Sequence, residues 1–228
     1  MQSANPKILH IDTSTRQFDE SREKHNSLSR KLANRFKKQW LTLQPKTEFI
    51  YRDLAISPPD FIDQAWIEAV FTPEAQRTEA QNAKVSLSNT LIDELITADI
   101  ILLSTPMYNY GMPAVLKAWF DQVIRVNKTF SFDLERGDFP LEPCLSGKTM
   151  VLLTSSGEFG FEAGGMRESM NHLGPHIKTL SHYLGVESVY EIGSEYQEFG
   201  DERHTESLNK AEEETVKLAS QLVKTVFV

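Results

Sequence analysis

The sequence of 228 residues predicts an open α/β fold, a parallel sheet with helices on both faces. Short apolar runs alternate along the chain with longer segments of helical spacing, which is the pattern of repeated βα units. Two of these runs, Ile100 to Leu103 and Thr149 to Thr154, are continuously apolar at their centres, as strands buried on both faces are. Five such strands predict a sheet in the order 2-1-3-4-5. The length suits one large α/β domain, so we expect residues 1–228 to form a single domain.

The first half of the chain begins with a strand, Lys7 to Ile11, that runs into a polar turn at Asp12. A helix is expected from near Ser27, because apolar residues recur four apart after it and Asn26 or Ser27 can cap it. Thr47 to Asp53 alternates as a second strand does. Residues from Phe61 to Ala98 have helical spacing, and Pro73 divides them into two helices or one broken helix.

The central unit is the stretch from Ala98 to Phe130. Its strand is followed by a loop, Thr105 to Met112, and then by a helix that Pro113 opens at the first helical position. The core face of this helix is apolar, whereas three polar residues are expected to point away from the core. These are Lys117, Asp121 and Gln122.

The second half of the chain continues the alternation. Prolines, Gly137 and alternating phenylalanines between Thr129 and Gly147 predict a short hairpin or excursion rather than a linker. The remaining expected elements are a fourth strand (Thr149 to Thr154), a helix (His172 to Leu184) ended by Gly185, a fifth strand (Glu187 to Ile192) and an amphipathic helix (Thr205 to Val226).

Three loops should meet beyond the carboxyl ends of the strands, where the strand order reverses and ligands bind in such sheets. The loop from Thr13 to Ser29 ends at a helix start, whose N–H groups and hydroxyls suit a phosphate. The loop from Thr105 to Met112 carries flat aromatic side chains. The loop from Ser155 to Gly165 is rich in glycine, which permits close backbone approach to a planar ligand. Serines at a helix start also serve simply as caps, so the residues leave both roles open.

The segment PMYNYGMPAVLKAWFDQVIRVNKTF, Pro106 to Phe130, resembles the FMN-dependent NADH:quinone oxidoreductases of the azoreductase type, which have a flavodoxin-like fold. The likeness extends more loosely from Ile8 to Gly157. It implies an FMN site with the phosphate at the first loop and the flavin ring between the other two. The residues that the resemblance assigns to FMN are Ser14, Ser27, Leu28, Ser29, Met107, Tyr108, Asn109, Tyr110, Ser155, Ser156, Gly157 and Glu158.

The sequence departs from this family pattern at two places. The loop at residues 15–26 is longer than the family loop. Glu158 stands where the family has the second glycine of the turn, and a residue with a side chain resists positive φ. The resemblance therefore implies FMN binding, and these two departures leave open whether the first and third loops keep the family geometry.

The function that the resemblance implies is the transfer of two electrons from NADH or NADPH to quinones or azo compounds by a ping-pong scheme, in a homodimer. The flavin carries the chemistry, so no catalytic side chain and no metal is assigned. Two alternatives stay open: a flavodoxin-type electron carrier, and a flavin-free binding module of the same fold. The aromatic residues Phe61, Trp66 and Phe71 are expected in the core or in a subunit contact.

The amino-acid composition argues against several classes of binding partner. A net charge of −8 argues against nucleic acid or an anionic membrane, since phosphates attract clustered Lys and Arg. No segment approaches the roughly 20 apolar residues of a membrane helix. Cys144 is the single cysteine, so no internal disulfide is possible and a cytoplasmic location is expected. The six histidines are scattered, as surface or core residues are.

Overall fold

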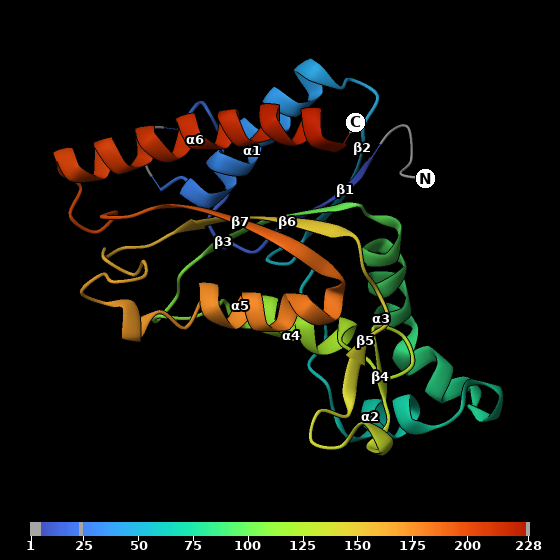
Figure 1. The fold of residues 1–228 in the computed structure, drawn as a ribbon. Coiled ribbons are helices and arrows are strands. Elements are labelled where there is room, and N and C mark those ends of the chain that lie inside the picture. The colour runs from blue at the N-terminus through green and yellow to red at the C-terminus, as the bar shows by residue number, and fades with distance from the viewer. Residues whose placement is uncertain (1–5, 23–24, 227–228) are drawn as a thin grey trace.

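The computed structural model describes residues 6–22 and 25–226, and they contain the parallel sheet of five strands that the sequence predicts (Figure 1). The strand order is β2-β1-β3-β6-β7, and each neighbouring pair is parallel. The predicted order 2-1-3-4-5 is therefore confirmed, because β4 and β5 form a separate hairpin. The strands of the sheet are β1 (Lys7–Asp12), β2 (Glu48–Asp53), β3 (Ile100–Pro106), β6 (Lys148–Ser155) and β7 (Val186–Ser194).

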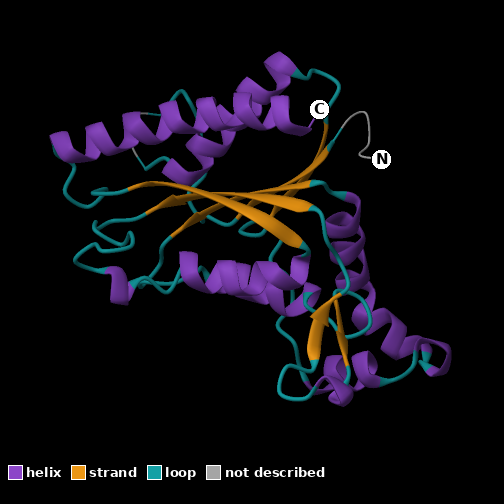
Figure 2. Cartoon of the chain, in the orientation of Figure 1, coloured by secondary structure: helices purple, strands orange, loops and turns teal. Residues whose placement is uncertain are grey.

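Helices cover both faces of the sheet, as Figure 2 shows. One face is covered by α1 (Leu28–Leu43) and α6 (Glu202–Val226), whose buried apolar residues form one core cluster with the sheet. The other face is covered by α3 (Glu79–Thr97), α4 (Ala114–Val123) and α5 (Gly174–Ser181). Among the helices in the described part of the chain, none has the length and apolar character needed to cross a membrane.

The central helix differs from the sequence expectation at both ends. Pro113 is the N-cap of α4 rather than its first helical residue. The expectation that Gln122 points away from the core is wrong, because its side chain is buried. Its Oε1 accepts a hydrogen bond from Nε1 of Trp66 (2.9 Å), and its Nε2 donates to the carbonyl of Asp60 (2.9 Å). A second element supplies Trp66 to this side of α4, and the segment before that element supplies the carbonyl of Asp60.

That second element is α2 (Gln64–Phe71), which ends shortly before Pro73 and is followed by a short 3₁₀ turn, Glu74–Gln76. The expected hairpin is formed by β4 (Phe130–Phe132) and β5 (Leu141–Pro143), which pair antiparallel. The hairpin lies at the same end of the molecule as α2 (Figure 1). Both elements stand beyond the layered body of the sheet and its helices.

The remaining helix ends follow local sequence. The N–H of Arg30 in the first turn of α1 donates to Oγ of Ser27, so Ser27 rather than Asn26 is the cap. The helix expected from His172 begins at Gly174, because Oδ1 of Asn171 accepts from the N–H groups of Leu173 and Gly174 at the start of α5. After a 3₁₀ turn, His182–Leu184, the chain leaves through Gly185 in the left-handed conformation.

Candidate functional site

The three predicted loops are in direct contact at the carboxyl edge of the sheet. The N–H of Met107 donates to the carbonyl of Ser155 (2.8 Å), which joins the second loop to the third. The hydroxyls of Tyr108 and Thr15 are 2.9 Å apart, which joins the second loop to the first. The hydroxyl of Tyr110 donates to Oε2 of Glu158 (3.0 Å). The sequence-predicted residues therefore gather around one place in the fold.

The start of α1 has the geometry of an anion site. Leu28 and Ser29 are its first two residues, and their N–H groups have no acceptor among the residues that the structure describes. The hydroxyls of Ser27 and Ser29 lie 3.3 Å apart, and both side chains are buried. Free N–H groups, paired hydroxyls and the positive end of the helix dipole together favour a phosphate. Ser27 is also the N-cap, so the two roles that the sequence left open are compatible.

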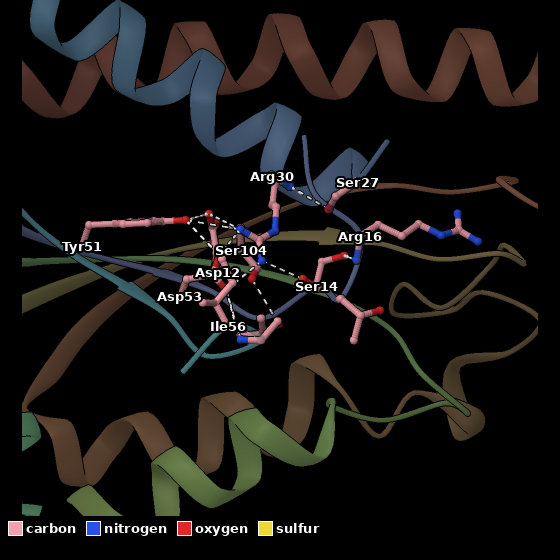
Figure 3. Close-up of polar contacts among 12 residues, drawn as sticks. Asp12, Ser14, Arg16, Ser27, Arg30, Tyr51, Asp53, Ile56 and Ser104 are labelled. Atoms are coloured by element: carbon pink, nitrogen blue, oxygen red, sulfur yellow. Dashed lines mark hydrogen bonds and ion pairs between the residues drawn. The ribbon is translucent and has the colours of Figure 1, made fainter. Parts of the chain in front are cut away.

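Ser14 reaches this helix start from the first loop (Figure 3). Its side chain is buried, and its Oγ accepts a hydrogen bond from the N–H of Arg16 (3.2 Å). Its carbonyl accepts from Nη2 of Arg30 (2.7 Å). The first loop and the first turn of α1 are thus bound to each other at Ser14.

The second loop contains a strained turn. Tyr108 and Gly111 exchange two backbone hydrogen bonds, and the two residues between them, Asn109 and Tyr110, have φ of 48° and 66°. Two left-handed residues make a tight turn of type I′. Asparagine tolerates this conformation, but for tyrosine it costs about 1–2 kcal/mol. The turn leaves Tyr108 36% and Tyr110 38% exposed, so strain and exposed aromatic rings coincide, as they do at many ligand sites.

The third loop avoids the strain that the sequence suggested for Glu158. Glu158 is not among the residues with positive φ, and Gly160 takes the left-handed conformation instead (φ 79°). The Oγ of Ser156 donates to the carbonyl of Glu158 (2.9 Å), and the carboxylate of Glu158 pairs with Nε of Arg167 (3.2 Å). The question that the sequence left open at Glu158 is answered for the backbone, because no residue with a side chain needs a positive φ at this turn.

A polar cluster beneath the first loop, buried at Asp12, Arg30 and Ser104 and open to solvent at Tyr51, was not predicted from the sequence. Arg30 binds Asp53 with both terminal nitrogens (2.6 and 2.8 Å) and reaches Oδ2 of Asp12 (3.2 Å). Tyr51 donates to the same oxygen of Asp12 (2.8 Å), and Ser104 donates to the other. Figure 3 shows these side chains converging from β1, β2, β3 and α1. The available signal was that Asp12 and Asp53 each end a strand, and they are register partners.

The cluster keeps its carboxylates charged. Burial raises the pKa of Asp12, but hydrogen bonds with His10 and Ser104 and the charge of Arg30 outweigh it, and the pKa lies below its usual value. Burial also raises the pKa of Asp53, and the hydrogen bonds and charge of Arg30 outweigh that effect. Burial and the charge of Asp12 raise the pKa of Tyr51, so this phenol stays protonated and donates.

Comparison with known proteins agrees with this geometry. A family model described as flavodoxin-like fold matches residues 6–219. The chain is 61% identical over 216 residues to the FMN-dependent NADH:quinone oxidoreductase 2 of Colwellia psychrerythraea strain 34H, which covers 95% of this chain and 99% of that protein. It is 58% identical to the protein of the same name from Idiomarina loihiensis, with 94% and 90% covered. The chain belongs to the FMN-dependent NADH:quinone oxidoreductase family.

This chain has the same fold as several solved azoreductase structures. An azoreductase from Bacillus anthracis strain Sterne superposes with a TM-score of 0.81 at 19% identity, covering 95% of this chain and 99% of that one. An FMN-dependent NADH-azoreductase from Bacillus anthracis strain Ames Ancestor, solved in complex with FMN, has a TM-score of 0.80 at 20% identity, with the same coverage. At these identities the likeness establishes the fold of this oxidoreductase family member.

Proposed function

We propose that the chain is an FMN-dependent oxidoreductase that uses NADH or NADPH to reduce quinones and azo compounds. The observation that carries the proposal is the contact of three loops, one with an anion-binding helix start and one with exposed aromatic rings, at the edge of the sheet where ligands bind. These features match the phosphate and the flat ring of FMN. Because relatives in the family are named FMN-dependent, FMN is the ligand that we propose for this site.

The residues have distinct roles in this proposal. Ser14, Ser27 and the N–H groups of Leu28 and Ser29 bind the phosphate. The loops on either side of the ring orient it and exclude water from one face of it. The residues of these two loops are Met107, Tyr108, Asn109, Tyr110, Ser155, Ser156, Gly157 and Glu158. When bound, FMN supplies the two-electron redox chemistry, so the chain needs no nucleophile of its own.

The two substrates use the same site in turn in our proposal, which is a ping-pong scheme. Tyr108 and Tyr110 stay partly exposed in the strained turn and offer flat surfaces to a nicotinamide or a quinone. A site with one open face holds one of these planar molecules at a time. The electron donor therefore leaves before the acceptor binds.

A homodimer is part of the proposal. α2 and the hairpin lie at one end of the molecule (Figure 1). These elements and the segment before α2 expose many large apolar side chains, and exposed apolar patches mark interaction surfaces. Trp66 of α2 is buried, whereas its neighbours are not. The exposed side chains are Phe61, Ile62, Ile67, Phe71, Phe132, Leu134, Phe139 and Leu141. We also propose that the chain acts as one domain and works in the cytoplasm, as the sequence predicts.

The deciding experiment is a spectrum followed by turnover. Purified protein is expected to show flavin absorbance, or to gain it with added FMN, and to oxidise NADH or NADPH continuously when benzoquinone is present. FMN binding without turnover would favour the electron carrier. Saturating FMN that changes neither the spectrum nor the melting temperature would favour the flavin-free binding module, because a ligand at 100 times its Kd stabilises a protein by about 2.7 kcal/mol.

A further inference from the structure

Arg30 occupies a special place beside the proposed phosphate site. It is the third residue of α1, and its backbone N–H donates to the cap hydroxyl of Ser27 (3.3 Å). Its side chain is 5% exposed and turns back to the first loop, where Nη2 donates to the carbonyl of Ser14 (2.7 Å). One residue thus contacts both segments that the proposed function assigns to the phosphate.

The guanidinium is itself held firmly. Asp53 accepts from both of its terminal nitrogens, and Asp12 and Tyr51 each lie 3.2 Å from Nη1. A planar guanidinium group that binds several fixed partners is held in a single orientation. The position of the Ser14 carbonyl is therefore set by the ends of β1 and β2, through Arg30.

Charge gives Arg30 a second effect. Asp12 and Asp53 are register partners at the edge of the sheet where an anion would bind, and their lowered pKa values keep both carboxylates ionised at neutral pH. The carboxylate of Asp12 is buried and that of Asp53 is partly buried, so both repel a phosphate more strongly than charges in bulk water would. Arg30 lies between them and offsets one of the two charges.

We propose that Arg30 is a positioning residue that makes this site selective for a phosphorylated flavin. It orders the first loop against the helix start and offsets the charge of Asp12 and Asp53, without binding the phosphate itself. The inference rests on the proposed function. It predicts that changes at Arg30 weaken FMN binding far more than binding of riboflavin, which has the same ring and no phosphate.

The test compares Kd values of the apoprotein for FMN and for riboflavin by quenching of flavin fluorescence. Arg30→Lys keeps the charge, but a single ammonium group does not satisfy Asp53 and Ser14 together. We expect its FMN affinity to fall by at least about tenfold, which corresponds to the loss of a charged hydrogen bond at the phosphate. We expect its riboflavin affinity to fall by less than about threefold, because riboflavin has no phosphate. Arg30→Gln also removes the charge and is expected to lose more FMN affinity.

Arg35→Gln is the matched control. Arg35 lies on the same helix and pairs with Glu212 (2.8 Å), with a side chain that is 48% exposed. This variant removes an equal charge from the side of α1 that pairs with α6, where Arg35 is bound to Glu212 rather than to Asp12, Asp53 or Ser14, so both affinities should stay within about twofold of the wild type. Melting curves show which variants fold. If Arg30→Gln does not fold, the comparison of Arg30→Lys with the wild type tests the proposal.

The outcomes separate the two proposals. An equal fall for both flavins, or an unchanged preference for FMN in Arg30→Lys, would overturn the role of Arg30 and leave the proposed function standing. A wild-type apoprotein that binds neither flavin would contradict the proposed function itself, and the inference with it.

Discussion

The hydroxyl of Tyr110 donates to the carboxylate of Glu158 over 3.0 Å and so connects the second and third loops of the proposed flavin site. Glu158 in turn pairs with Arg167, whose guanidinium lies 4.7 Å from the ring centre of Phe159. Glu158, which departs from the family pattern in the sequence, thus adds a side-chain link to the backbone bond between Met107 and Ser155 that already joins these loops.

This link predicts a change in the titration of Tyr110. The hydrogen bond to Glu158 and its negative charge raise the pKa of Tyr110, so Glu158→Gln should lower that pKa. The phenolate absorbance of Tyr110 is isolated by subtracting the titration of Tyr110→Phe from that of the wild type, and likewise in the Glu158→Gln background. An unchanged or higher pKa would mean that the two side chains are apart in solution.

The helix start predicts selective loss of FMN. Ser27→Ala with Ser29→Ala removes two hydroxyls from the proposed phosphate site, and each hydrogen bond to a charged group contributes roughly 1.5–3 kcal/mol. FMN binding should weaken accordingly, whereas riboflavin binding should hardly change. Isothermal titration of the apoprotein with each flavin measures both. Ser21→Ala, in the exposed part of the first loop, is the control, and equal losses for both flavins would place the damage in the helix cap alone.

The buried cluster predicts a loss of stability in acid. Because the folded-state pKa values of Asp12 and Asp53 are lowered, their contribution is present above the unfolded-state value near 3.9 and is lost as the pH falls through the folded-state values. Asp53→Asn lacks part of this contribution. Urea unfolding should therefore show a larger difference between wild type and Asp53→Asn at pH 7 than at pH 3.

The control for the acid experiment is Asp138→Asn, at an exposed position of the hairpin. Its free energy of unfolding should stay close to that of the wild type at both pH values. A stability difference for Asp53→Asn that is equal at pH 7 and pH 3 would show that Asp53 does not act through its charge.

The apolar patch predicts a change in oligomeric state. Phe71 is 72% and Phe139 is 85% exposed, so Phe71→Ser with Phe139→Ser should leave the fold of each chain intact while weakening a dimer that covers them. Sedimentation velocity should show a dimer for the wild type and a larger monomer fraction for the variant. Leu43→Ser, at the end of α1, is the control. A variant that sediments as the wild type does would exclude this face as the interface.

The sheet was predictable because its signals are local. The apolar run at Ile100 to Leu103 and the one around Val151 define strands without reference to the rest of the chain, and alternation with helices defines their direction. The polar ends of β3 and β6 were expected to be loop, and the strands continue to Pro106 and Ser155 because the neighbouring strands still offer hydrogen-bond partners there.

The buried cluster was not predictable in the same way. Arg30, Asp12 and Asp53 are separate polar residues in the sequence, and only the pairing of β1 with β2 under α1 brings them together. Gln122 was misplaced for a related reason, since helical spacing identifies the face toward the sheet but not a second face covered by α2. Both the polar cluster and the burial of Gln122 depend on contacts between segments that are distant in the sequence.

At Tyr110 the residue that would stabilise the turn differs from the residue that the proposed function needs. Glycine at this left-handed position would relieve the backbone of its strain, but the exchange would also remove the ring and its bond to Glu158. A laboratory selection for heat resistance alone would favour that exchange, whereas a selection for turnover would reject it. Tyr110 is therefore a position at which evolving the chain toward greater robustness and preserving its proposed activity lead to different amino acids.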